Sequence, residues 1–307
     1  MTMEYHLPVM LIECIEALNI RPDGIYVDVT FGGGGHSRAI MEHLGSEGHL
    51  YAFDQDEDAL ANAIDDARFT LIHENFRHLK SFLRLHGVRK VDGILADLGV
   101  SSHQFDEGSR GFTFRTDGEL DLRMDRRQAV NAKDLVNQLD EAELRQIFKL
   151  YGELPNAGAM ASAICNARKE APIETTFQLK EAVRRHLPRN QENKFLAMLF
   201  QALRIEVNGE LEALKAMLTQ AVEILNPGGR LVVMSYHSLE DRLVKNMMKT
   251  GNFEGNLEKD FYGNPIVPLK VISRKAITPQ PEELERNNRS RSAKLRVAEP
   301  VERVVNK

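Results

Sequence analysis

The sequence predicts an α/β protein in which one doubly wound parallel sheet is interrupted by an inserted all-helical domain. Between Gly24 and about Gly99, apolar β-like segments alternate with helical ones, which is the rhythm of βαβ units. From Asn131 to Leu225 the pattern is helical throughout, and a buried-strand run, "RLVVMSY", then begins at Arg230. A sheet pattern that stops and resumes indicates an insertion.

The expected strands, in order, are residues 25–29, 49–53, 70–72, 91–97 and 230–236, each an apolar run of strand length. Helical periodicity predicts helices at 37–44, 57–66 and 77–85, and in the insertion at 132–139, 141–151, 157–169, 176–186 and 191–225. The last of these is expected to break near Asn208-Gly209 and to stop at Pro227-Gly228-Gly229. We expect the sheet domain to comprise residues 1–108 and 206–307, with the helical domain at 109–205.

Composition narrows the functional class. The chain has 307 residues, which exceeds the usual length of a single domain. It holds two cysteines, and no apolar run approaches the ~18 residues needed to span a membrane. Residues 1–10 lack the charged start and apolar run of a signal peptide, so a cytoplasmic protein with free thiols is expected. The net charge is −5, yet residues 270–307 hold ten Lys/Arg against five acidic residues. The charge is therefore segregated along the chain.

A ligand loop is predicted in "VDVTFGGGGHS", where glycines directly follow an apolar strand and let a ligand approach main-chain N–H groups. Walker A chemistry needs Lys-Ser/Thr after the glycines, but Gly35 is followed by His36-Ser37-Arg38. The dinucleotide fingerprint also fails, because Arg38 stands where its third glycine belongs. A nucleoside-type ligand without a pyrophosphate remains, and the alternative is a tight turn that binds nothing.

Three carboxylates lie within or at the end of the predicted strands. Asp54 ends the second strand, where α/β nucleoside sites place the acceptor for ribose hydroxyls, although an exposed carboxylate after a strand is the alternative. Asp28 lies inside the first strand and needs a partner, either loop N–H groups or a charged end of the ligand. Asp97 closes the fourth strand in "ADLGVSS", where it accepts hydrogen bonds from a target amine or caps the next turn.

"SYHSLEDR" follows the last predicted strand. Ser238 and Asp241 have the spacing of a helix N-cap pair, which leaves Tyr236 and His237 to stack on or hydrogen-bond a base at the sheet edge. No G-x-S-x-G elbow supports a Ser-His-Asp triad, and two cysteines with scattered histidines predict no metal site.

Two further segments have alternative interpretations. "RNNRSRSAKLR", from Arg286, interleaves cations with small polar residues and suits phosphate contacts, or it is a solvated basic face. "RGFTF", from Arg110, is either an RNA-stacking loop or a hydrophobic plug.

Together these motifs resemble the ribosomal small-subunit methyltransferase H family. The matching stretches are "YHLPVML", "TFGGGGHS", "DLGVSSHQFD", "RGFTF", "LDLRMD", "FQALRIEVNGEL", "SYHSLEDR" and "RSRSAKLR". The resemblance implies a Rossmann-like class I methyltransferase domain that uses S-adenosyl-L-methionine to methylate the N4 amine of a cytosine in the decoding region of 16S rRNA. It implies 16S rRNA or the small ribosomal subunit as partner, leaves monomer and homodimer open, and assigns RNA recognition to the inserted domain.

The resemblance implies cofactor contacts at Gly34, Gly35, His36, Asp54, Phe76, Asp97 and Gln104. For the transfer step the residues themselves indicate Asp97, Tyr236 and His237 as catalytic candidates. Three other functions are alternatives. One is a methyltransferase of the same fold that acts on DNA, protein or a small molecule, and another is an inactive RNA-binding homologue. The third is a nicotinamide oxidoreductase, which the failed dinucleotide fingerprint disfavours.

Overall fold

The computed structural model describes residues 8–301. The start of "YHLPVML", most of residues 1–10 and the last residues of the basic region therefore lie outside the described residues. The described chain forms two compact units. One contains the residues up to Gly99 and those from Leu211 onward, and the other is Val100–Glu210. The sequence placed the boundaries after residues 108 and 205. The units divide at other points because Val100 already packs against the core of the helical unit, whereas α10 (Glu210–Ile224) packs on the sheet.

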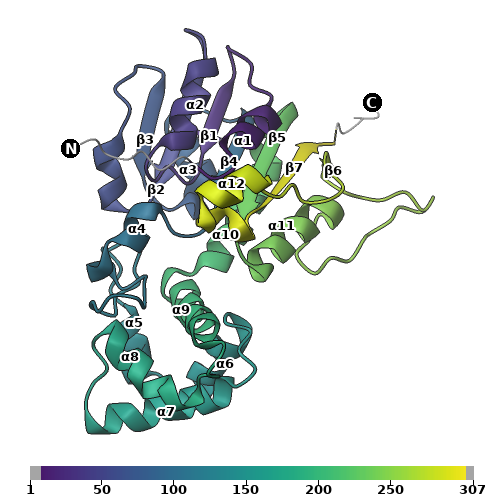
Figure 1. Cartoon of the computed structure of the whole chain (residues 1–307). Coiled ribbons are helices and arrows are strands. Elements are labelled where there is room, and N and C mark those ends of the chain that lie inside the picture. The colour runs from purple at the N-terminus through teal and green to yellow at the C-terminus, as the bar shows by residue number, and fades with distance from the viewer. Residues whose placement is uncertain (1–7, 302–307) are drawn as a thin grey trace. The chain divides into compact units, whose positions relative to one another are not determined.

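The first unit is built on a seven-stranded sheet with the order β3-β2-β1-β4-β5-β7-β6 (Figure 1). The first five strands in that order are parallel, and β7 is antiparallel to both of its neighbours. The predicted parallel sheet is therefore confirmed. The bounds are β1 Ile25–Asp28, β2 His49–Asp54, β3 Phe69–His73, β4 Val91–Asp97, β5 Leu225–Ser235, β6 Leu269–Val271 and β7 Lys294–Pro300.

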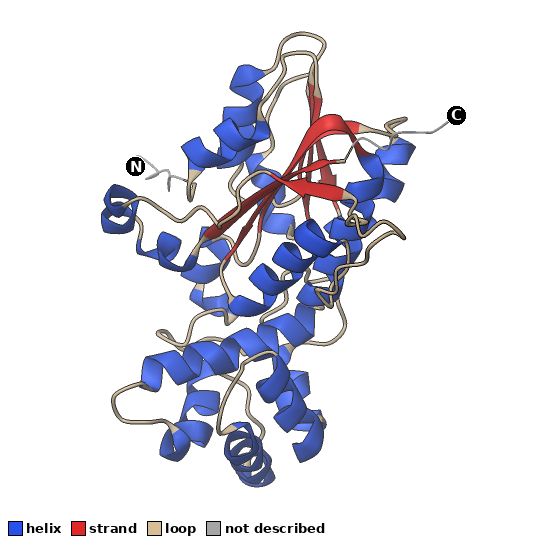
Figure 2. Cartoon of the chain, turned by 90° about the vertical axis from the view of Figure 1, so that its right-hand side faces the viewer, coloured by secondary structure: helices blue, strands red, loops and turns tan. Residues whose placement is uncertain are grey.

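Helices cover both faces of this sheet, as Figure 2 shows. Alternate residues of the strands point to opposite faces and belong to two separate cores. On one face, Val27 and Ile94 pack with α10 and α11. On the other face, Tyr26 and Leu95 pack with α1 and α2. This is the doubly wound arrangement that the uninterrupted apolar strands predicted. The bounds are α1 Leu11–Leu18, α2 Gly35–His43, η1 Glu57–Asn62, η2 Phe76–His78, α3 Leu79–Leu85, α11 Ser238–Thr250, α12 Pro281–Arg286 and η5 Asn288–Ser292.

Two local predictions in this unit were wrong. The helix expected over 57–66 is the shorter 3₁₀ helix η1, because Ala63 leaves the helical region at ψ 142°. Helix α10 ends at Ile224, and Pro227-Gly228-Gly229 belong to β5 rather than to a helix stop. The β4–β5 register shifts here, and the Asn226 side chain donates to Asp92 (2.8 Å). The glycines thus form an irregularity within the strand.

The second unit is helical: α4 Ser102–Asp106, η3 Gly108–Arg110, α5 Ala132–Gln138, α6 Glu141–Leu150, α7 Ala157–Glu170, α8 Thr176–Val183, η4 Arg184–His186 and α9 Glu192–Asn208. The predicted break is confirmed, since Gly209 ends α9 with φ +57°. "RGFTF" is the hydrophobic plug: Phe112 is buried, Phe114 lies 5.5 Å from the Phe200 ring, and Arg110 is 1% exposed. None of the helices in residues 8–301 is long and apolar enough to cross a membrane.

Asn208 ties α9 to the extended segment after η3. Its buried Nδ2 donates to the carbonyl of Leu122, which has φ +61°, and its Oδ1 accepts from the Met124 N–H, each at 2.8 Å. Asn208→Ala removes both of these buried hydrogen bonds, so we expect the free energy of unfolding to fall by about 1–3 kcal/mol. Urea denaturation measures it. Asn193→Ala, at an exposed position of α9, is the control, and equal stability of the two variants contradicts the prediction.

Candidate active site

The glycine loop connects β1 to α2 at the carboxyl edge of the sheet. Gly32 and Gly34 have φ +50° and +74°, so each supplies a left-handed conformation. A Cβ on Gly34 would lie 2.9 Å from the Phe31 ring, and one on Gly35 would lie 2.2 Å from Pro8. No atom of residues 8–301 lies within 4 Å of a Cβ built on Gly33. Among these residues, the loop therefore packs tightly on one side and leaves open space beside its second glycine.

The buried side chain of Asp28 forms hydrogen bonds with residues on both sides of the four glycines. Its carboxylate accepts from the Thr30 N–H (3.0 Å) and from the Ser37 hydroxyl (2.7 Å), and the residue is 1% exposed. A loop N–H group, that of Thr30, is thus confirmed as a partner of the buried carboxylate. Burial raises the pKa of Asp28, and the hydrogen bonds from Ser37 and Thr30 counteract part of that rise.

Asp54 joins the same loop from the end of β2. One carboxylate oxygen accepts from the Gly32 N–H (2.7 Å) and the other from the Asp56 N–H (2.9 Å). Burial raises its pKa to about 6, against the lowering effect of those two hydrogen bonds. The residue is only partly buried, so lone pairs of the carboxylate remain available to a ligand. The loop and the second-strand carboxylate therefore form one structure.

Asp97 is tied to the loop through Thr30. Its N–H donates to the Thr30 hydroxyl (2.7 Å), and its carboxylate accepts from the Tyr236 hydroxyl (2.7 Å). Burial raises the pKa of Asp97 to about 6. No hydrogen bond from the following turn to this side chain occurs among the described residues, so the geometry does not match a turn cap. Three strand ends, of β1, β2 and β4, thus converge on one hydrogen-bonded network.

His36 and Tyr236 flank the Asp97 carboxyl. His36 Nε2 lies 3.1 Å from the Val9 carbonyl oxygen, a partner that requires an N–H there, so Nδ1 faces Asp97 at 3.8 Å. Burial, followed by the charge of Asp97, raises the pKa of Tyr236 well above its ordinary value. The phenol therefore keeps its proton and acts as the donor. Of these two neighbours, Tyr236 is the one that donates a hydrogen bond to the Asp97 carboxyl.

The comparisons with known proteins decide the family. The family model described as "MraW methylase family" matches residues 3–301. The chain belongs to the MraW methylase family. It is 59% identical over 300 residues to Ribosomal RNA small subunit methyltransferase H of Flavobacterium johnsoniae, covering 98% of this chain and 99% of the relative. The protein of the same name from Bacteroides fragilis is 57% identical over 295 residues, covering 96% and 97%. The sheet order and the helices on both faces are those of a Rossmann-like fold, as expected of a class I methyltransferase in this family.

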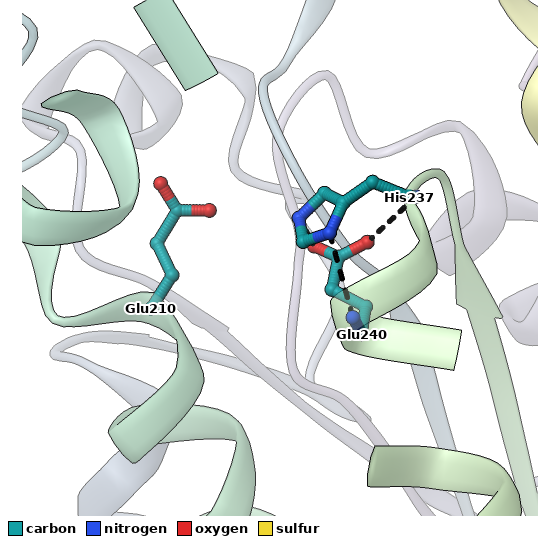
Figure 3. A group of neighbouring side chains, drawn as sticks. All are labelled: Glu210, His237 and Glu240. Carbon is teal, nitrogen blue, oxygen red and sulfur yellow. Dashed lines mark hydrogen bonds and ion pairs between the residues drawn. The ribbon is translucent and has the colours of Figure 1, made fainter. Parts of the chain in front are cut away.

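His237 of this MraW methylase caps a helix. Its Nδ1 accepts from the Glu240 N–H (3.4 Å) at the start of α11, and Glu240 Oε1 lies 3.1 Å from Nε2, as Figure 3 shows. The predicted cap by Ser238 and Asp241 was wrong, because His237 has the extended conformation of an N-cap and Ser238 is already helical. Glu240 also accepts from the Tyr236 N–H (2.9 Å). The cap therefore fixes the backbone that carries the phenol.

Sequence reasoning missed Glu240, Thr30 and Ser37 as parts of the MraW methylase site. The signal for Glu240 was readable, since "HSLE" has the first and fourth positions of a capping box with histidine in place of Ser or Thr. Thr30 and Ser37 carried no such signal, because their partners come from the ends of β4 and β1.

Two expected cofactor residues belong to other elements, Phe76 to η2 and Gln104 to α4. Phe76 begins η2 after β3 and packs, partly buried, against the core formed with α10 and α11. Gln104 belongs to the helical unit, where it is buried in α4 and its Oε1 accepts from the Ser101 N–H (3.1 Å) within a capping box.

Proposed function

We propose that this MraW methylase transfers a methyl group from S-adenosyl-L-methionine to the exocyclic N4 amine of a cytosine in the decoding region of 16S rRNA. Family membership and relatives named as small-subunit rRNA methyltransferases support the reaction class. The observation that carries the proposal is the network in which Asp28, Asp54 and Asp97 join the glycine loop at three strand ends. Ligands of open α/β sheets bind at that edge.

The residues fit this cofactor chemically. Asp28, Asp54 and Asp97 all have pKa values raised by burial, and in Asp54 and Asp97 the neighbouring carboxylates add to the rise. Three such carboxylates favour a cationic ligand, because a positive charge offsets both desolvation and mutual repulsion. S-adenosyl-L-methionine carries a sulfonium and an ammonium group.

In the proposed site, Asp54 accepts the ribose hydroxyls, while Gly34, Gly35 and His36 border the ligand with their backbone. Phe76 and Gln104 complete the set on the strength of the family resemblance. The sulfonium supplies an electrophilic methyl group when the cofactor is bound. Asp97 accepts an N–H of the target amine, orients its lone pair in line with that methyl group and receives the released proton.

Tyr236 and Thr30 hold Asp97 in place for this step, from the side chain and from the backbone. His237 acts as a positioning residue through the Glu240 cap, because its Nδ1 is used in that hydrogen bond. Cytosine N4 lies in a base stack in folded rRNA, so the base is unstacked before transfer.

Two features separate this proposal from its rivals. An inactive RNA-binding homologue has no need for three aspartates hydrogen-bonded to the loop through side chain or backbone. A small-molecule methyltransferase has no need for the basic segment, whose Arg289 and Arg291 are exposed in η5. We place the protein in the cytoplasm with its rRNA substrate.

Incubation with labelled cofactor and unmethylated small subunits, followed by mass-spectrometric mapping, tests the reaction. Label in any nucleoside other than N4-methylcytidine, or in none, rejects it.

Cofactor affinity is expected to depend on pH. With pKa values of about 6, Asp54 and Asp97 are protonated below pH 6 in the unliganded protein. A cationic ligand favours the ionised forms, so affinity rises from pH 5 to pH 7, by at most about tenfold per pH unit for each group, and binding releases protons near pH 6. Calorimetry in two buffers of different ionisation enthalpy measures both effects. Asp54→Asn flattens the profile, whereas a wild-type affinity that is constant over this range contradicts the prediction.

A further inference from the structure

A β-hairpin with an ordered tip lies between α11 and β6, and Figure 1 shows this excursion of the chain. Lys259 pairs with Pro265 in an antiparallel bridge, and the Ile266 N–H donates to the Glu258 carbonyl (2.9 Å). The Asp260 N–H donates to the carbonyl of residue 264 (2.9 Å). The strands of the hairpin are thus paired up to the turn.

The Asp260 side chain holds the turn itself. One oxygen accepts from the N–H groups of Tyr262 and Asn264, both at 2.8 Å, and the other accepts from the Asn264 side chain (3.0 Å). Gly263 supplies the left-handed conformation at φ +86°. The tip is therefore preorganised, so binding to it costs little conformational entropy.

This tip presents two aromatic side chains to solvent. Phe261 is 97% exposed and Tyr262 is 84% exposed, and their rings meet edge to face with centroids 5.6 Å apart. Exposed rings add almost nothing to the stability of the fold. A fixed turn that displays a pair of them points to a binding partner.

A groove lies at the base of the hairpin. It has a volume of about 630 Å³, and its apolar lining includes Leu257, Val267 and Val301. Its cationic lining residues are Lys249, Lys270 and Arg274. Lys270 pairs with Glu299 (3.0 Å), whereas Lys249 and Arg274 form no ion pair with any residue from 8 to 301. The groove therefore combines apolar surface with two cations available to an anion.

We propose that the hairpin and the groove bind a single-stranded segment of RNA, with bases stacked on Phe261 and Tyr262 and phosphates at Lys249 and Arg274. The choice of RNA as the class of partner rests on the proposed function, whereas the location of the binding surface does not. Unpaired bases stack on aromatic rings, and their phosphates need cations nearby, so one ligand matches both features. Residues 249–275 hold five Lys/Arg and three acidic residues, and Asp260 is already used by the turn. This surface adds an RNA contact that the active-site residues do not supply.

Fluorescence anisotropy tests it with a labelled single-stranded oligoribonucleotide and a duplex of the same sequence. Phe261→Ala with Tyr262→Ala weakens single-strand binding about tenfold, leaves duplex binding nearly unchanged and keeps the salt slope. Lys249→Gln with Arg274→Gln weakens both and lowers the slope of log affinity against log salt by about 1.4 for the single strand. Leu85→Ala, which removes a 78% exposed apolar side chain from the same unit, is the matched control with wild-type affinity.

The two proposals fail separately. Wild-type single-strand affinity in the aromatic double variant overturns this inference, even where small subunits are methylated normally. If that variant instead elutes as a smaller particle than the wild type, the tip is a face for self-association. Absence of methylation by the wild type, with the aromatic dependence of RNA binding intact, overturns the proposed function alone. Unchanged cofactor affinity shows that both double variants are folded.

Discussion

Asp97→Ala slows single-turnover methyl transfer by about 100-fold at saturating cofactor and small subunit. The rate falls because the target amine loses the group that positions it. The Asp97 carboxyl is oriented by the Tyr236 hydroxyl at 2.7 Å and by its own N–H bond to Thr30 at 2.7 Å. Its removal leaves the target amine without an acceptor at the sheet edge and removes the hydrogen-bond partner of the partly buried Tyr236 phenol. Rapid-quench measurement of N4-methylcytidine formation gives the rate.

Conservative variants separate the roles around Asp97. Asp97→Asn keeps a carbonyl acceptor and retains more activity than Asp97→Ala, whereas Tyr236→Phe loses only the orienting hydrogen bond and slows transfer by about tenfold. If Asp97 chiefly binds the cofactor, both Asp97 variants raise the apparent Michaelis constant for S-adenosyl-L-methionine and keep the saturated rate. A full single-turnover rate for Asp97→Ala refutes its catalytic role and leaves Tyr236 and His237 as candidates.

Asp54→Ala raises the dissociation constant for S-adenosyl-L-methionine by about 100-fold. Hydrogen bonds to a charged acceptor contribute at most roughly 1.5–3 kcal/mol each, and the proposed site loses two ribose contacts with this side chain. The change also frees the Gly32 N–H, which Asp54 holds at 2.7 Å, so the glycine loop loses a support. Isothermal titration calorimetry at pH 7.5 measures the loss.

Two controls isolate the Asp54 contact. Asp65→Ala removes an exposed carboxylate from the same unit and is expected to bind cofactor as the wild type does. Asp54→Asn keeps one acceptor and loses less affinity than Asp54→Ala. A folded Asp54→Ala protein with wild-type affinity removes Asp54 from the cofactor site.

The parallel part of the sheet was readable from the chain because each strand is a short apolar run followed by a helical period. That pattern depends on neighbours a few residues apart. The same holds for the glycine loop and for the break at Gly209, where local backbone conformation requires the residue type. The His237 cap was missed although it is local, because the cap prediction expected a hydroxyl and took Ser238.

By itself the sequence determined the α/β class, the helical insertion, the glycine loop and the strand-end positions of Asp54 and Asp97. Only the tertiary structure decided which side chains meet: Tyr236 reaches Asp97 across 139 residues because β4 and β5 are neighbours in the sheet. It also decided that β7 runs antiparallel between β5 and β6, and where the chain divides into units. These features depend on contacts between distant segments, and periodicity along the chain encodes only contacts between near ones.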